Sequence, residues 1–486
     1  MKKFGLFIGG KWVVPDSKAR FISLNPATKK PVASFPSANE KDVLYAISIA
    51  KAAFPKWSAI PAPKRGEVLL RFASLLRKNK ERLARVVTQE MGKVLLEARG
   101  DVQEAIDAAE YMAGEGRRLF GYTAPSELPN KAAFTVREPI GVCALITPWN
   151  FPVAIPAWKM MPALVCGNTV VFKPSSDTPL CAAMFVELLH EAGIPGGVVN
   201  MVTGSGGIVG PVLVQNPDVR TVSFTGNRET GEWIAKNAGV KKIGLELGGK
   251  NPIIIMDDAD LHLALEGVLW GAFGTTGQRC TAASRVIVHE KVFAEFEKML
   301  VVAAKKLRLG SGASSSADVG PLINQKALEK SQYFVSVGIK EGARLLCGGK
   351  RGPHSGFFFE PTVFSGVAQK MRVAREEIFG PIVCLIKVKN LAEAIKTAND
   401  VDYGLSASIY TKGISNAFKA IEQLESGIVY VNASTIGAEV HLPFGGVKGT
   451  GNGVREAGIE GINEFSETKT VYIDYSGKLQ RAQIDD

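Results

Sequence analysis

The chain has 486 residues and 46% hydrophobic content, enough to bury a large core in two or three domains. The formal net charge is +11, but basic residues are interleaved with acids, as in 90–99, and no basic–aromatic stripe typical of nucleic-acid binding is present. The longest apolar runs, such as 140–146, are too short to span a bilayer, and the run 4–8 is too short for an export signal. We therefore expect a cytoplasmic protein without nucleic-acid or membrane partners, and an acidic small molecule is the simpler explanation for the positive charge.

The cysteines and histidines give no sign of a metal site. No CxxC pair occurs, and the five histidines lack the spacing of metal ligands. This distribution fits a reducing compartment. Five thiols lie in apolar stretches, where cysteine behaves as a small buried hydrophobe: Cys143, Cys166, Cys181, Cys347 and Cys384.

The first 120 residues predict a short hairpin that turns at Gly9-Gly10, followed by helices. Apolar stripes with helical spacing run through Val43, Leu44, Ile47, Ile49 and Ala50, and through Val68, Leu69, Phe72, Leu75 and Leu76. From 140 to 249, strands alternate with helices, which indicates a parallel sheet with right-handed crossovers. We expect strands at 142–146, 169–172, 198–202, 221–224 and 243–247, and helices at 178–192, 207–215 and 227–238.

The alternation restarts beyond Lys250 and predicts a second α/β domain that runs to about Gly446. A helix at 261–273 is followed by a strand at 285–289 and a helix at 292–306. The stretch 469–475 alternates apolar and polar residues, as an exposed strand does. Its candidate partner is a hairpin at about 121–139.

One cysteine lies in a polar turn and is the candidate nucleophile. Cys280 belongs to the sequence Gly-Gln-Arg-Cys-Thr at 277–281, in which Gly277 permits a tight turn and Arg279 adds positive charge. A thiolate in such a turn attacks a carbonyl carbon and forms a covalent adduct. The alternative is a sixth buried thiol without chemistry.

Two further motifs supply a carboxylate and an amide. Glu246 opens the glycine-rich sequence Glu-Leu-Gly-Gly-Lys, and a thiol with a base is the minimum set for covalent chemistry at a carbonyl. Asn150 stands between Pro148 and Pro152, which fix the turn that aims its side chain. One such amide donor stabilises an oxyanion transition state by about 3–4 kcal/mol. A structural carboxylate and a turn asparagine are the alternatives.

Together with Phe172-Lys173-Pro174, these motifs resemble the aldehyde dehydrogenase superfamily, from about residue 5 to about residue 475. The resemblance implies an α/β fold with a Rossmann-type cofactor domain, a second α/β catalytic domain and a small oligomerisation sheet. It assigns 1–120 and 140–249 to the cofactor domain and 250–446 to the catalytic domain. The segments 121–139 and 447–486 would then bridge subunits of a homodimer or homotetramer.

The resemblance also implies the chemistry. Cys280 would form a thiohemiacetal with the aldehyde, stabilised by the Asn150 amide and the Cys280 N–H, and Glu246 would activate water to hydrolyse the thioester. Relatives that transfer the acyl group to coenzyme A lack this glutamate, so a free carboxylic acid is the expected product. Glu456 resembles a second carboxylate credited with proton relay, but the family runs Gly-Arg-Glu, and the inserted Val454 leaves that role open.

A dinucleotide site is implied at the carboxyl ends of the strands. Phe224-Thr225-Gly226 with Gly231 resembles the family's pyrophosphate turn. Arg228 either touches phosphate or faces solvent. The remaining residues that the resemblance assigns to the cofactor are Thr147, Pro148, Trp149, Lys173, Leu247, Glu377 and Phe379.

The choice between NAD and NADP depends on the pocket around Lys173, which would bind the adenosine ribose. Many NAD-preferring relatives carry a glutamate three residues later, where this chain has Ser176. Without that carboxylate, Lys173 can pair with a 2′-phosphate, so NADP should be tolerated beside NAD. This argument requires the adjacent Asp177 to point away from the pocket.

The aldehyde itself is less well defined by sequence. Segments 111–116 and 151–159 resemble dehydrogenases of α-ketoglutarate semialdehyde, and 432–439 resembles aminoadipate semialdehyde enzymes. Phe444 would line the aldehyde tunnel. We expect a dicarboxylic-acid semialdehyde, with succinate semialdehyde or a broad range of aliphatic and aromatic aldehydes as alternatives. A non-catalytic descendant of the fold and a thiol hydrolase are the remaining possibilities.

Overall fold

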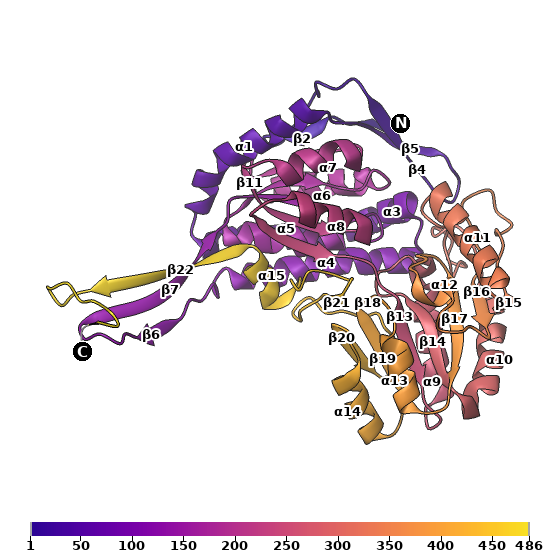
Figure 1. The fold of residues 1–486 in the computed structure, drawn as a ribbon. Coiled ribbons are helices and arrows are strands. Elements are labelled where there is room, and N and C mark those ends of the chain that lie inside the picture. Colours follow the sequence, from indigo (N-terminus) through magenta and orange to yellow (C-terminus); the bar gives the residue numbers. More distant parts are fainter. Residues whose placement is uncertain (1, 485–486) are drawn as a thin grey trace.

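The computed structural model describes residues 2–484 and contains two large sheets, each covered by helices on both faces (Figure 1). A slender β-arm extends away from this body (Figure 1). Within the described residues no helix is both long and apolar enough to cross a lipid bilayer.

The first sheet has seven strands, and five consecutive strands in it are parallel to one another. The predicted N-terminal hairpin adds two antiparallel strands at one edge. Its turn residues Gly9 and Gly10 have φ values of 66° and 83°, which glycine adopts without strain. In sheet order the strands are β12 (Lys242–Glu246), β11 (Val219–Thr225), β8 (Val142–Ile146), β9 (Thr169–Lys173), β10 (Val199–Met201), β2 (Leu6–Ile8) and β3 (Lys11–Val13).

Helices cover both faces of this sheet because successive residues of the buried strands face opposite layers. In β8, Cys143 and Leu145 pack into one core, whereas Val142 and Ala144 pack into the other. The helices of the first core are α2 (Ala62–Lys78), α3 (Lys80–Met91), α4 (Leu95–Glu115), α5 (Ala154–Cys166) and α6 (Pro179–Glu191). Those of the second are α1 (Glu40–Ser58), α7 (Gly206–Gln215) and α8 (Arg228–Asn237).

The strands and helices predicted between 140 and 249 are all present, each within two residues of the expected ends. The two apolar stripes also lie on helices, but not all their members are buried. Leu44 is 41% exposed, and Ile49 and Leu75 are half-buried, with one side packed against the core. A helix buries only one stripe of its surface, and these positions lie at its margin.

The second sheet has the order β15 (Arg344–Cys347), β16 (Thr362–Ser365), β17 (Ile382–Val388), β14 (Ala283–His289), β13 (Asn251–Ile255), β19 (Ser406–Tyr410) and β20 (Ile428–Val431). One face packs against α9 (Leu261–Phe273) and α10 (Glu290–Lys306). The other packs against α11 (Gln325–Lys340), α12 (Arg372–Arg375), α13 (Leu391–Asn399) and α14 (Ile414–Gln423). A short 3₁₀ turn, η1 (Gly274–Gly277), follows α9 and precedes Cys280.

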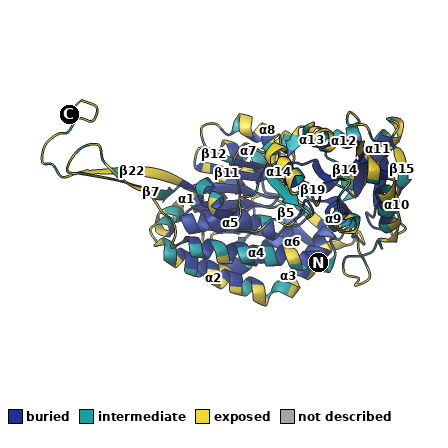
Figure 2. Ribbon diagram, turned by 90° about the horizontal axis from the view of Figure 1, so that it is seen from below, coloured by how far each residue is buried: buried dark blue, intermediate teal, exposed yellow. Residues whose placement is uncertain are grey.

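The arm is a three-stranded antiparallel sheet in the order β22 (Ser466–Asp474), β7 (Lys131–Pro139) and β6 (Thr123–Pro125). It confirms the predicted pairing of the C-terminal strand with the hairpin, and β22 follows directly after α15 (Gly458–Glu464). Most of its length is exposed, including the apolar side chains of Tyr472 and Ile473 (Figure 2).

Two small sheets complete the fold. One, with the order β1 (Lys2–Lys3), β5 (Pro31–Pro36) and β4 (Arg20–Leu24), was not predicted. The other pairs β18 (Tyr403–Gly404) with β21 (Val447–Lys448).

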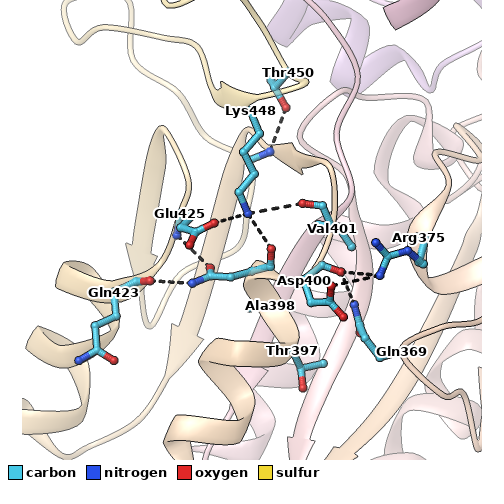
Figure 3. Close-up of polar contacts among 12 residues, drawn as sticks. Gln369, Arg375, Thr397, Ala398, Asp400, Val401, Gln423, Glu425, Lys448 and Thr450 are labelled. Carbon is cyan, nitrogen blue, oxygen red and sulfur yellow. Dashed lines mark hydrogen bonds and ion pairs between the residues drawn. The ribbon is translucent and has the colours of Figure 1, made fainter.

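Strand β21 belongs to a strap, residues 447–451, that joins the two halves of the molecule. Lys448 Nζ forms an ion pair with Glu425 and donates to the carbonyl of Asn399 at 2.6 Å (Figure 3). The Thr450 hydroxyl accepts from Gly404 N at 3.0 Å and donates to Gly248 O at 2.9 Å. The strap therefore connects the half of the molecule that contains the second large sheet to the turn after β12.

Candidate active site

A cavity of about 1060 Å³ lies between the two halves, at the carboxyl ends of β8, β9, β11 and β12. Parallel sheets bind their ligands at this end. Cys280, Glu377 and part of α11 close the cavity from the second half.

Cys280 lies at this boundary and is half-buried, whereas the other thiols of the described residues are buried. Its carbonyl accepts from Asn251 Nδ2 at 2.7 Å, and a Cβ on Gly249 would come within 2.4 Å of the same oxygen. The Glu-Leu-Gly-Gly-Lys turn thus packs directly on the backbone of the cysteine. Burial and the negative charges of Glu246 and Glu377 raise the pKa of Cys280 to about 12, so its thiol is protonated at neutral pH.

Asn150 lines the same cavity and is buried, and its Oδ1 has no hydrogen-bond partner. Its loop is fixed by Asp101, whose Oδ1 accepts from Ala154 N at 2.8 Å and from Val153 N at 3.3 Å. Asp101 thereby satisfies free N–H groups at the start of α5. The sequence did not single out this aspartate.

Glu246 ends β12 and is buried, close enough to Cys280 to raise its pKa, although it does not line the cavity. Burial and the charge of Glu456 raise the pKa of Glu246 well above its usual value. A Cβ on Gly445 would lie 2.7 Å from Glu246 Oε1, so glycine is needed there to leave room for the carboxylate.

A buried charge cluster lies behind Glu246. Lys159 Nζ forms an ion pair with Glu456 and donates to Ser223 Oγ at 2.9 Å. Glu456 also pairs through its backbone with Phe444. Glu464, which the sequence did not reveal, faces the same lysine, and burial raises its pKa to about 7.

At its other end the cavity has the shape and donors that a dinucleotide requires. A Cβ on Gly206 or Gly210 would have no heavy atom within 4 Å, so this face of α7 leaves room for a planar ring. The N-terminus of α8 points free N–H groups to the same space, and Thr225 Oγ1 is buried without a partner. The cofactor residues that the sequence predicted and that line the cavity are Thr147, Pro148, Trp149, Lys173, Ser176, Phe224, Thr225, Gly226, Leu247, Glu377 and Phe379.

The pocket around Lys173 differs from the expectation in one respect. Ser176 donates to the carbonyl of Gly204 at 3.1 Å, and burial lowers the pKa of Lys173 to about 8. Asp177 also lines the cavity, and its carboxylate accepts from Asn324 Nδ2 at 3.2 Å, so the expectation that it points away is wrong. A carboxylate at this position disfavours the 2′-phosphate of NADP.

Two lysines on α11 restore positive charge opposite this carboxylate. Lys326 and Lys330 both line the cavity, and the sequence analysis missed them. Their spacing of four residues on a helix is the signal that was available, because it places them on one face.

The second half holds Glu377 and Phe379. Glu377 Oε1 accepts from Gly249 N at 2.8 Å, and the Phe379 ring packs edge-on against Trp149 at 5.4 Å. The glutamate thus joins the nucleotide end of the cavity to the turn beside Cys280.

Three other candidates lie outside the cavity. Gly231 packs against Leu247, where a Cβ would come within 2.4 Å, so its part in any cofactor site is indirect. Arg228 pairs with acidic residues on the surface, as in the solvent-facing alternative. Phe444 packs against the Trp158 ring at 5.1 Å, and its place in an aldehyde tunnel stays a prediction.

Comparisons with known proteins agree with this arrangement. The model of the aldehyde dehydrogenase family matches residues 12–471. The α-ketoglutaric semialdehyde dehydrogenase of Bacillus subtilis is 40% identical over 96% of this chain and 97% of its own length. Retinaldehyde dehydrogenase 3 of Rattus norvegicus is 43% identical over 96% of this chain and 92% of its own length.

A solved structure shows the same fold with a cofactor bound. Betaine aldehyde dehydrogenase from Staphylococcus aureus in complex with NAD+ superimposes with a TM-score of 0.96, at 36% identity, and the match covers 98% of this chain and 96% of that one. Members of the family use NAD or NADP. The chain belongs to the aldehyde dehydrogenase family and is an NAD(P)-dependent oxidoreductase.

Proposed function

We propose that the protein oxidises a semialdehyde of a dicarboxylic acid, such as α-ketoglutarate semialdehyde, to the free acid through a thioester on Cys280. The observation that carries the mechanism is the position of Cys280 and Asn150 at the inner end of the cavity, with the buried Glu246 beside the thiol.

The first step is attack of the Cys280 sulfur on the aldehyde carbon. Because the thiol is protonated at neutral pH, a base must take its proton, and the Glu246 carboxylate, whose charge acts on the thiol, is the candidate. The carbonyl oxygen becomes an oxyanion that accepts from Asn150 Nδ2 and the Cys280 N–H. The loop that carries Asn150 is held in place by Asp101, which accepts from Ala154 N.

A bound nicotinamide ring would supply the hydride acceptor that conversion of the Cys280 adduct to a thioester requires. Lys173 and Ser176 would hold the adenosine ribose, Glu377 the nicotinamide ribose, and Phe379 would pack beside the ring. Either NADP or NAD is expected as the cofactor, since Ser176 should allow NADP to be tolerated.

Hydrolysis completes the cycle. Once Glu246 has released the proton that it took from the thiol, it removes a proton from water, and the resulting hydroxide attacks the thioester carbon. The C–S bond then breaks, which releases the acid and returns Cys280 as a thiolate that takes up a proton. The proton that Glu246 takes lies next to the Lys159–Glu456 pair, which supports a part for Glu456 in releasing it.

The substrate assignment rests on similarity and charge. Segments 111–116 and 151–159 resemble enzymes for α-ketoglutarate semialdehyde, the Bacillus subtilis relative carries that name, and a net charge of +11 suits an anionic substrate. A broad-specificity aldehyde dehydrogenase is the second candidate, because the retinaldehyde enzyme is similarly close.

Steady-state formation of reduced cofactor tests both candidates. The panel comprises α-ketoglutarate, succinate and aminoadipate semialdehydes and neutral aliphatic and aromatic aldehydes, each with NAD and with NADP. A higher kcat/KM for the semialdehydes supports the first candidate, and equal values across the panel support the second. Loss of turnover in Cys280→Ser, with cofactor binding retained, is the control for the mechanism.

We also propose that the protein acts in the cytoplasm as a homodimer or homotetramer. The free thiols of the described residues fit a reducing compartment, and the exposed apolar side chains of the arm favour contact with a second subunit. Light scattering on the purified protein measures the subunit number directly.

A further inference from the structure

The backbone just before Cys280 has an unusual conformation. Thr275, Thr276 and Gly277 follow one another with φ values of 51°, 59° and 67°, all in the left-handed region. Glycine adopts this region freely, but threonine rarely does, because its branched Cβ crowds the neighbouring carbonyl. Two consecutive threonines in this conformation are therefore strained, and contacts from outside the turn must hold them.

Glu97 of α4 provides the shortest of these contacts. Its Oε1 accepts from Thr275 N at 2.7 Å, and its side chain is only 4% exposed. The other contacts come from residues of the same half of the molecule: Thr276 Oγ1 donates to Gly320 O at 3.1 Å, and Gln278 Oε1 accepts from Ile323 N at 2.8 Å. Among the hydrogen bonds of the turn within the described residues, the one to Glu97 alone reaches the first half of the molecule.

The same carboxylate is linked to the neighbourhood of Asn150. Arg279 pairs with Glu97 at 3.5 Å and donates through Nε to Thr275 Oγ1 at 2.9 Å. Its guanidinium lies over the Phe151 ring, 5.2 Å from the ring centre, and Phe151 follows Asn150 in the chain. Glu97 thus contacts the turn before the nucleophile and the arginine that packs beside the oxyanion donor.

We infer that Glu97 is a positioning residue, which holds the cysteine turn in its left-handed form and so keeps Cys280 aligned with Asn150. Without the carboxylate, Thr275 N is left unpaired in the interior, and both threonines gain by leaving the left-handed region. The turn then relaxes, and the sulfur moves away from the place where the Asn150 amide can donate to the oxyanion. The inference rests on Cys280 as the nucleophile and is independent of which aldehyde is oxidised.

The test measures attack by Cys280 without cofactor or aldehyde. p-Nitrophenyl acetate acylates a reactive cysteine, and the burst of p-nitrophenolate gives the acylation rate of the full-length protein. Glu97→Ala should lower this rate by about tenfold or more, since an unpaired buried donor costs about 1–3 kcal/mol. In a Thr275→Asn background, Glu97→Ala should lower the acylation rate much less, because asparagine tolerates the left-handed region.

A matched control lies on the same helix. Glu115 is also buried and pairs with Arg118 at 2.6 Å, but no contact joins it to the cysteine turn. Glu115→Ala should affect thermal melting without changing the acylation rate. Glu97→Gln is the milder variant, because its amide oxygen still accepts from Thr275 N, and it should lose much less activity than Glu97→Ala.

Two results would overturn the inference. One is an unchanged acylation rate in Glu97→Ala. The other is an equal loss with threonine and with asparagine at 275, which would show that Glu97 acts through general stability. A wild-type protein that is not acylated at Cys280 would instead overturn the nucleophile assignment, and the inference with it.

Discussion

Lys159 forms an ion pair with Glu456 inside the protein, where the lysine side chain is 0% exposed and the glutamate 4%. Glu246 and Glu464 face the same cluster, so three carboxylates share one ammonium group. The negative charge of Glu456 disfavours a second charge on Glu246 and raises its pKa.

Glu456→Gln should therefore shift the acid limb of the kcat profile to lower pH. Removal of the charge lowers the pKa of Glu246, so this base is deprotonated, and active, at a pH about one unit lower. The profile is measured from pH 5 to pH 9 with a saturating aldehyde. Glu90→Gln, a buried carboxylate remote from this cluster, should leave the limb where it is. An unshifted limb in Glu456→Gln would mean that Glu456 does not act on the base.

The thiol of Cys280 should react faster with iodoacetamide as the pH rises. Its pKa of about 12 lies above the whole working range, and only the thiolate reacts, so the rate should rise about tenfold per pH unit between pH 7 and pH 9. Mass spectrometry of the labelled peptide gives the rate for this site, and the buried thiols should stay unlabelled. A plateau below pH 8 would contradict the raised pKa.

A carboxylate in the ribose pocket should select against NADP. Ser176→Glu places a negative charge where Lys173 would meet the 2′-phosphate, and kcat/KM with NADP should fall by about tenfold or more. The value with NAD should change far less. Ser176→Thr keeps the hydroxyl and serves as the control. Equal losses with both cofactors would indicate that position 176 does not contact the ribose.

Thr450→Val should destabilise the protein. The fully buried hydroxyl of Thr450 accepts from Gly404 N and donates to Gly248 O, and its loss leaves both groups unpaired at a cost of about 2 kcal/mol. Urea unfolding measures the free energy, and kcat should fall as well because the turn after Glu246 loosens. Thr28→Val, on the surface, should change neither. An unchanged unfolding midpoint in Thr450→Val would show that the strap adds no stability.

The sequence predicted regular elements better than the contacts between them. Strands such as β8 and β9 were identified because a strand that is buried on both faces of a parallel sheet is a short, continuous apolar run between turns. The candidate residues Cys280 and Asn150 were predicted from short motifs that are weak signals singly and become specific in combination and in this order. Asp101 and Glu464 were missed, because each acts through a partner more than fifty residues away in the chain.

Two further features contradicted local rules. Nothing in a Thr-Thr pair predicts a left-handed turn, since both residues favour extended backbone, and the contacts that hold it, such as the bond from Thr275 N to Glu97, come from distant parts of the chain. The side-chain direction of Asp177 depends on Asn324, which lies across the cavity on the other half of the molecule.

The start of the β-arm, near Ser466, and the carboxylate of Glu246 lie at opposite ends of one short strand, β12. β12 begins at Lys242, whose Nζ donates to the carbonyls of Asn463 and Ser466 where the arm starts, and it ends at Glu246. β12 is paired with β11 along its whole length, so its two ends belong to one rigid element. Substitutions at the distant tip of the arm, which touch neither aldehyde nor cofactor, should therefore alter the hydrolysis rate whenever they alter how the arm is seated.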